Sequence, residues 1–250
     1  MVVSGTRDQR IAAIAQHQRS RVGRQQLLAA GIGDGAIKRM VATGALHPRH
    51  AGVYAVGHPG SVELGDETAA LLACNERAVL SHWTALAMWS LLPIRRQHTV
   101  HVTILGQGHP HQPGITVHRT TRLDRKDIRM RHDLPVTSPA RTLLDLAPQL
   151  TNRQLERALE EALATTATRR NQVAETVARM PGRAGASRLE ALLDPRRPRS
   201  RTWNDGEERL LRLLRETGEP EPEANYRWRD FTFDFYWREF RLALELDGYP

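Results

Sequence analysis

The sequence contains one cysteine, Cys74, among 250 residues. A single thiol excludes a disulfide within the chain and a zinc site built from cysteines. No apolar run approaches the roughly 20 residues that are needed to span a bilayer. The N-terminus also lacks the basic-then-apolar pattern of a secretory signal. We therefore expect a cytoplasmic protein without a membrane partner.

Lysine is scarce as well, because Lys38 and Lys126 are the only two. The formal net charge is nevertheless +8, so arginine supplies nearly all of the positive charge. Arginine suits bidentate contact with phosphate and guanine. A GC-rich genome would explain the choice of arginine over lysine, but it would not explain the excess of positive charge.

Residues 20–57 combine two short helical patterns, separated by glycines, with a hairpin pattern that runs from Leu46 to Val56. A further helical pattern over 7–18 precedes them. Helix, turn, helix and hairpin follow one another in a winged helix-turn-helix, which we place at residues 1–58. A small helical packing unit with solvated arginines would give the same pattern, and spacing alone favours DNA binding only slightly.

Basic residues stand where such a domain would meet double-stranded DNA. Lys38 and Arg39 lie opposite the apolar side of the second helix of the motif, which is the helix that enters a major groove. Arg49 and His50 lie at the tip of the hairpin. Phosphate contacts of this kind predict a steep loss of affinity with salt. The expected DNA contacts are Arg21, Arg24, Lys38, Arg39, Arg49 and His50.

Residues 59–194 are expected to form a helical domain that contains one β-hairpin. Alternating β-branched residues predict two strands, 98–105 and 114–121, joined by a loop rich in glycine and proline. Helical patterns cover 61–75, 81–92, 151–165, 168–180 and 185–193. The hairpin region is rich in histidine, which raises the question of a metal site. We do not favour a metal there, because no carboxylate or cysteine completes a set with His98, His101, His109, His111 and His118.

The segment 133–147 contains a more specific helix signal. Thr137 or Ser138 can cap a helix whose first position is Pro139. Arg141 and Asp145 are four residues apart and can pair along that helix.

The run 195–202 is a linker of proline and arginine, and residues 203–250 follow it as a separate segment. A helix that contains Glu207 precedes two alternating strands that pair as a hairpin. Asp234, Glu245 and Asp247 can then share one face of the hairpin. Clustered carboxylates repel one another unless a cation intervenes, and their oxygens suit Mg²⁺ or Mn²⁺. Such a metal would activate water for phosphodiester hydrolysis, with Glu207 assisting, whereas the alternative is the solvated face of an ordinary hairpin.

The chain resembles the AbiEi-type antitoxin family of bacterial type IV toxin–antitoxin systems over roughly residues 7–165. The motifs are Gln-Leu-Leu at 26–28, RHAGVYAVG at 49–57, LSHWTALAMWSL at 80–91 and PVTSPARTLLDLA at 135–147. The resemblance implies a winged helix that binds and represses its own promoter. It also implies a helical half that opposes a nucleotidyltransferase-type toxin.

Residues 203–250 look like the start of a second family, the endonucleases similar to very-short-patch-repair enzymes in the PD-(D/E)xK class. That resemblance implies that Asp234, Glu245 and Asp247 hold the metal and that Glu207 assists. Members of the family continue past the Glu-x-Asp-Gly strand, whereas this sequence stops at Pro250. We therefore expect a partial α/β endonuclease-like segment that is inactive by itself, either because the chain is truncated or because a partner supplies the remainder. The motifs are Glu207, Pro222, Asn225, Phe233-Asp234-Phe235 and Leu244-Glu245-Leu246-Asp247-Gly248.

The overall expectation is an α+β protein that is mainly helical and binds DNA sequence-specifically as an antitoxin and autorepressor. The alternative is a Mg²⁺-dependent endonuclease, a hydrolase that the winged helix targets to DNA. A third, weaker possibility is a protein-interaction module formed by residues 61–193.

Overall fold

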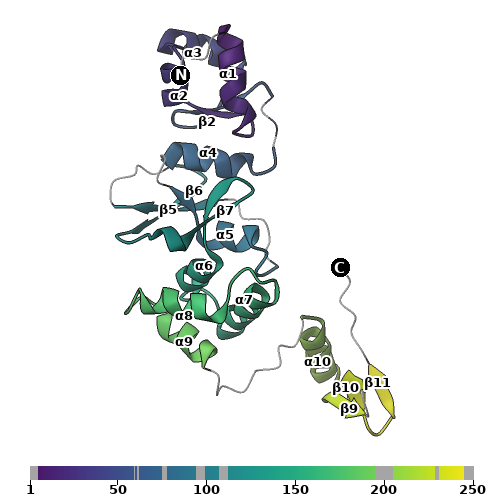
Figure 1. The fold of residues 1–250 in the computed structure, drawn as a ribbon. Coiled ribbons are helices and arrows are strands. Elements are labelled where there is room, and N and C mark those ends of the chain that lie inside the picture. Colours follow the sequence, from purple (N-terminus) through teal and green to yellow (C-terminus); the bar gives the residue numbers. More distant parts are fainter. Residues whose placement is uncertain are drawn as a thin grey trace. The chain divides into compact units, whose positions relative to one another are not determined.

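The computed structural model describes residues 5–58, 60, 62–74, 78–93, 99–106, 112–194, 205–228 and 231–244. The chain divides into two units, Met1–Arg197 and Pro198–Pro250 (Figure 1). Among the described residues, no helix has the length and apolar character required to cross a membrane.

The N-terminal part of the first unit is a three-helix cluster on a small antiparallel sheet with strand order β1-β3-β2. Its core contains Ile11, Leu27, Ile37 and Leu46. The expected helices and hairpin are confirmed, except that the beginning of the first helical pattern in residues 20–57 forms a short strand. The elements are α1 (Arg7–Gln16), β1 (Arg21–Gly23), α2 (Arg24–Ala29), α3 (Asp34–Ala42), β2 (Leu46–His50) and β3 (Val53–Val56).

The turn between α2 and α3 depends on Gly31, whose φ of 77° lies in the left-handed region. A Cβ at this position would lie 2.9 Å from Nη1 of Arg10, which donates a hydrogen bond to the carbonyl of Ala30. Both the backbone and the neighbouring side chain therefore require glycine here.

We predict that Gly31→Ala will lower the free energy of unfolding by about 1–2 kcal/mol, the cost of a left-handed conformation for an L-residue. Gly35→Ala is the matched control, because Gly35 lies in α3 with nothing within 4 Å of its added Cβ. That control should stabilise the protein by up to about 1 kcal/mol. Equal effects of the two variants in urea unfolding would contradict this account of the turn.

The middle of the first unit is a five-stranded mixed sheet with strand order β6-β5-β4-β8-β7. Helices α4 and α5 contact its central strands. Trp89 packs against this core and also against the helical core that follows. The elements are α4 (Gly65–Cys74), β4 (Val79–Leu80), α5 (His82–Met88), β5 (Val100–Leu105), β6 (Ile115–Thr120), η1 (Arg125–Asp127), β7 (Ile128–Arg131) and β8 (Leu134–Thr137).

The prediction of a β-hairpin over 98–121 is wrong. Strands β5 and β6 lie where the alternation placed them, but they pair in parallel, with Val100 opposite Ile115 and Leu105 opposite Thr120. The connecting residues, 106–114, can reach about 30 Å when extended, which exceeds the ~20 Å length of either strand. The short spacing therefore did not require an antiparallel turn. The four consecutive buried residues 101–104 fit an interior strand that is covered on both faces.

Four helices complete the first unit and surround the core that contains Leu143, Leu155, Val173 and Leu189. Ser138 caps the first of them by accepting a hydrogen bond from Arg141 N, as expected. The helices are α6 (Pro139–Leu146), α7 (Asn152–Ala164), α8 (Arg170–Ala178) and α9 (Ala186–Leu193), and all four were predicted.

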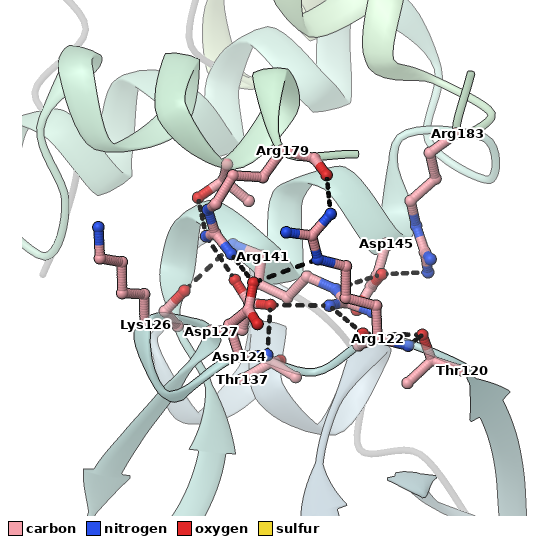
Figure 2. A network of polar contacts seen from close by, with 12 residues as sticks. Thr120, Arg122, Asp124, Lys126, Asp127, Thr137, Arg141, Asp145, Arg179 and Arg183 are labelled. Atoms are coloured by element: carbon pink, nitrogen blue, oxygen red, sulfur yellow. Dashed lines mark hydrogen bonds and ion pairs between the residues drawn. The ribbon is translucent and has the colours of Figure 1, made fainter. Parts of the chain in front are cut away.

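A buried network of ion pairs joins η1 to these helices (Figure 2). The side chains of Asp127 in η1 and of Arg141 and Asp145 in α6 are fully buried. Arg141 donates from Nη1 to Asp127 Oδ2 over 3.1 Å and from Nε to Asp145 Oδ1 over 2.9 Å. The expected pairing of Arg141 with Asp145 is therefore confirmed.

Two further arginines complete the network from the end of α8 and the turn after it. Arg179 donates to Asp127 Oδ1 over 2.6 Å and to Asp124 Oδ2 over 2.7 Å, and Arg183 contacts Asp145. Each fully buried carboxylate therefore meets two guanidinium groups, which offsets part of the cost of its desolvation.

The second unit is described over 205–228 and 231–244 as a helix, α10 (Asp205–Thr217), and an antiparallel sheet with strand order β11-β10-β9. The expected hairpin between β10 (Phe231–Trp237) and β11 (Leu242–Leu244) is confirmed. A third strand, β9 (Glu223–Trp228), was not expected between the helix and the hairpin, and it pairs with β10 along its length. The fully buried Phe235 anchors this small sheet.

Candidate nucleic-acid interface

Helix α3 presents two cations on its outer side. Lys38 and Arg39 are exposed, whereas Ile37 and Met40 are 3% and 7% exposed and face the core. Figure 1 shows α3 on the side of the N-terminal sheet opposite α4. The outer face of α3 therefore lies open to a nucleic acid.

Arg24 lies at the start of α2 and reaches the start of α3. Its Nη2 is 2.7 Å from Oδ2 of Asp34, and both side chains are partly exposed. The carboxylate of Asp34 also favours the positive N-terminal end of α3. The expected phosphate contact of Arg24 thus competes with an ion pair that joins the two helices of the motif.

Arg21 does not reach the surface, so the expectation that it contacts DNA is wrong. Its side chain is fully buried, and its Nη1 donates to the carbonyls of Arg19 and Ser20 over 3.3 and 3.4 Å. The guanidinium lies against Gly65 at the start of α4, where an added Cβ would be 2.6 Å from Nη2. Burial lowers the pKa of Arg21, and the nearby charge of Arg49 lowers it further. Strand β1 packs against α4, a long-range contact that local spacing could not reveal.

Arg49 and His50 also lie elsewhere than expected. Both are half-buried, because the tip of the β2–β3 hairpin lies against the middle sheet: Ala51 N donates to Gln112 Oε1 over 3.3 Å. They line a cavity together with residues of α4 and α5. Burial lowers the pKa of His50 despite the opposing effect of Asp66. The expected outward, cationic tip is therefore corrected to an inward one.

The excess of positive over negative charge is concentrated in this part of the chain. Residues 1–58 contain eight arginines or lysines and only two aspartates. An excess of positive charge on a small domain attracts the phosphate backbone. After the corrections, Lys38 and Arg39 are the expected contacts that remain exposed and are not part of an ion pair among the described residues.

Three histidines come together in the middle domain, although no metal-binding group of three emerges among the described residues. His101 Nδ1 lies 3.0 Å from His118 Nε2, and the ring of His82 stacks on His118 with centroids 3.4 Å apart. Sequence reasoning missed His82, because nothing local indicates that the start of α5 meets β5 and β6. His98, His109 and His111 lie outside the described residues.

Burial lowers the pKa of all three clustered histidines, to about 2 for His82 and to about 4 for His118. The positive charge of the neighbouring Arg183 contributes to the shifts of His82 and His118. These histidines are therefore neutral near pH 7, and their arrangement resembles a packed polar core more than a catalytic centre.

The expected metal-binding acids are only partly visible. Asp234 lies half-buried on β10. Glu207 lies in α10, but its side chain is outside the described residues, as are Glu245 and Asp247. Their meeting on one face, and with it the Mg²⁺ site, stays a prediction.

Comparison with known proteins finds a family model that matches the middle of the chain. Residues 86–195 match the family model described as the AbiEi antitoxin C-terminal domain. This match spans the second half of α5, strands β5 to β8 and helices α6 to α9. It supports the expected resemblance to AbiEi-type antitoxins.

Similar proteins occur in Mycobacterium tuberculosis. The uncharacterized protein Rv2248 of strain H37Rv is 29% identical over 209 residues, which cover 79% of this chain and 72% of that protein. The uncharacterized protein MT2308 of strain CDC 1551 matches equally well. The crystal structure of the RV2827C protein has a TM-score of 0.50 and 18% identity, over 76% of this chain and 77% of that one. At this identity, the likeness concerns the fold alone.

Proposed function

We propose that this chain is an antitoxin of AbiEi type that binds double-stranded DNA through α3 and represses transcription. The observation on which the DNA-binding part depends is the exposed pair Lys38 and Arg39 on α3, opposite a fully formed core. The match of residues 86–195 to an antitoxin domain supports the same role. It also favours a toxin as the functional counterpart, of the nucleotidyltransferase type that the resemblance implies.

The arrangement of residues 7–57 supports a winged helix-turn-helix. Helix α2, a turn at Gly31 and helix α3 follow one another, and the β2–β3 hairpin comes next. A major groove about 12 Å wide admits an α-helix whose exposed side chains then reach base edges and phosphates. In this proposal, α3 enters the groove, and a repressor of this kind blocks transcription by occupying the promoter.

Selection of bound duplexes from a random DNA pool tests the proposal directly. We expect enrichment of a defined sequence, and a loss of affinity for it as salt rises, because phosphate contacts release counterions. Failure to retain any duplex at low salt would contradict DNA binding. It would favour an interaction module formed by residues 61–193.

The double variant Lys38→Gln/Arg39→Gln should bind the selected duplex at least about tenfold more weakly and with a salt slope that is smaller by up to about 2. Arg169→Gln/Arg170→Gln is the matched control, because it removes an exposed adjacent basic pair at the start of α8. Fluorescence anisotropy at several salt concentrations measures both quantities. Unchanged affinity in the α3 variant would show that this helix is not the docking element.

A further inference from the structure

A cavity of about 500 Å³ lies between the β2–β3 hairpin, α4, α5 and the turn that joins β7 to β8. Small-molecule sites in proteins typically occupy about 300–1,000 Å³. The apolar part of the lining includes Leu64, Trp83 and Met88. The cavity therefore has the volume and the apolar surface to hold a small organic molecule.

One set of lining residues is cationic. Arg49 belongs to β2, and Arg131 lies at the end of β7. Arg131 is held in place, since its Nε donates to the carbonyl of Met88 over 3.3 Å and its guanidinium lies 5.4 Å from the ring centre of Trp89. A fixed guanidinium is a suitable partner for a carboxylate, because it offers two parallel donors.

A second set of lining residues is acidic. Glu63, Asp66 and Glu67 lie just before and within the first turn of α4. Across the described part of the chain, none of these three carboxylates forms a hydrogen bond or an ion pair with a protein group. Opposite charges thus line one cavity, and the electrostatic effect of Asp66 on Arg21 and His50 involves no direct ion pair among the described residues.

We propose that this cavity binds a zwitterion with an apolar body, the chemistry shared by aromatic α-amino acids and short peptides. The carboxylate of the ligand meets Arg49 and Arg131, and its ammonium group meets the acids of α4. Its apolar body lies against Trp83 and Met88. A ligand with both charges pairs with both sets of lining residues, whereas a ligand with one charge pairs with only one of them.

Isothermal titration calorimetry of the full chain with three related probes tests the proposal. The probes are L-tryptophan, tryptamine, which lacks the carboxylate, and indole-3-propionate, which lacks the ammonium group. We expect tryptophan to bind at least about tenfold more tightly than either analogue, because each analogue loses one charged hydrogen bond. Glycyl-tryptophan is a fourth probe, and comparison of its affinity with that of tryptophan shows whether the cavity prefers a short peptide or a free amino acid.

Two variants test the cationic and the acidic lining residues of the cavity separately. Arg49→Gln should weaken the binding of tryptophan at least about tenfold and leave the binding of tryptamine within about twofold, because tryptamine has no carboxylate to pair with Arg49. The double variant Asp66→Asn/Glu67→Gln should weaken the binding of tryptophan at least about tenfold and leave that of indole-3-propionate within about twofold, because indole-3-propionate has no ammonium group. Arg125→Gln is the matched control, because it removes an exposed arginine that does not line the cavity. The thermal midpoint of each unliganded variant shows whether it folds.

The proposal is overturned if neither tryptophan nor glycyl-tryptophan binds at about 10 mM, where even a ~1 mM site is nearly saturated. It is also overturned if tryptamine and indole-3-propionate bind as tightly as tryptophan, or if Arg49→Gln behaves like Arg125→Gln. Binding is measured without DNA, so failure of the DNA-binding role of α3 does not affect the result.

Discussion

Arg141→Met is expected to lower the free energy of unfolding by about 3–5 kcal/mol, the usual cost of breaking a buried ion pair. The side chains of Arg141, Asp127 and Asp145 have no exposed surface. Without Arg141, both carboxylates keep only one guanidinium each and stay desolvated. For a unit of nearly 200 residues, such a loss corresponds to a fall of about 10 °C in Tm.

Arg129→Met is the matched control, because Arg129 is exposed on β7 and its hydrogen bonds within the described residues go to backbone carbonyls of its own segment. It should change the stability by no more than about 0.5 kcal/mol. Adding Asp145→Leu to Arg141→Met should recover part of the loss, because one of the unpaired charges is then removed. Urea unfolding of the four proteins measures these differences. A loss below about 1 kcal/mol for Arg141→Met would show that the network tolerates an uncompensated charge.

Acidification from pH 7 to pH 5 is expected to destabilise the first unit by about 2 kcal/mol or more, through its buried histidines. The pKa of His82 falls from 6.5 to about 2 in the folded protein, because burial disfavours the charged form and His118 and His101 lie beside it. The unfolded chain therefore binds more protons than the folded one at every pH between those values. The unfolding equilibrium constant then rises about tenfold per pH unit below 6.5 for each such histidine.

His82→Asn is the variant that isolates this effect. Asparagine cannot be protonated, and it tolerates the left-handed conformation at this position, where φ is 50°. Urea unfolding at pH 7, 6 and 5 should give a smaller slope of stability against pH for the variant. Ordinary carboxylates titrate below this window, so they do not obscure the result. An identical slope in both proteins would mean that His82 is not buried and neutral in solution.

The helices were the part of the fold that the sequence predicted best. Apolar residues at helical spacing located α6 to α9, and Ser138 and Pro139 marked the start of α6 correctly. Each of these signals is local, so a single segment contains all the information that it needs. The pair Arg141 and Asp145 was found in the same way, because i and i+4 residues always lie on one helix face.

The sheet of the middle domain was largely missed, for a physical reason. Strands β4, β7 and β8 have two to four residues, too few to show a period of two. Parallel pairing of β5 and β6 depends on the path of the connection, which spacing does not fix. The inward positions of Arg21, Arg49 and His50 follow from the packing of the N-terminal sheet on α4 and the middle sheet. The cluster around His82 likewise joins residues from three elements that are distant in sequence.

The backbone at the hairpin tip is tied to the start of both helices of the motif. Arg24 N donates to Gly52 O over 2.6 Å, and the side chain of Arg24 pairs with Asp34 at the first residue of α3. A displacement of β2 by a molecule beside Arg49 would therefore be transmitted to α3 within two contacts. Thermodynamic linkage is reciprocal. If a bound duplex changes the affinity of the cavity for its ligand by some factor, the ligand must change the affinity of the protein for that duplex by the same factor.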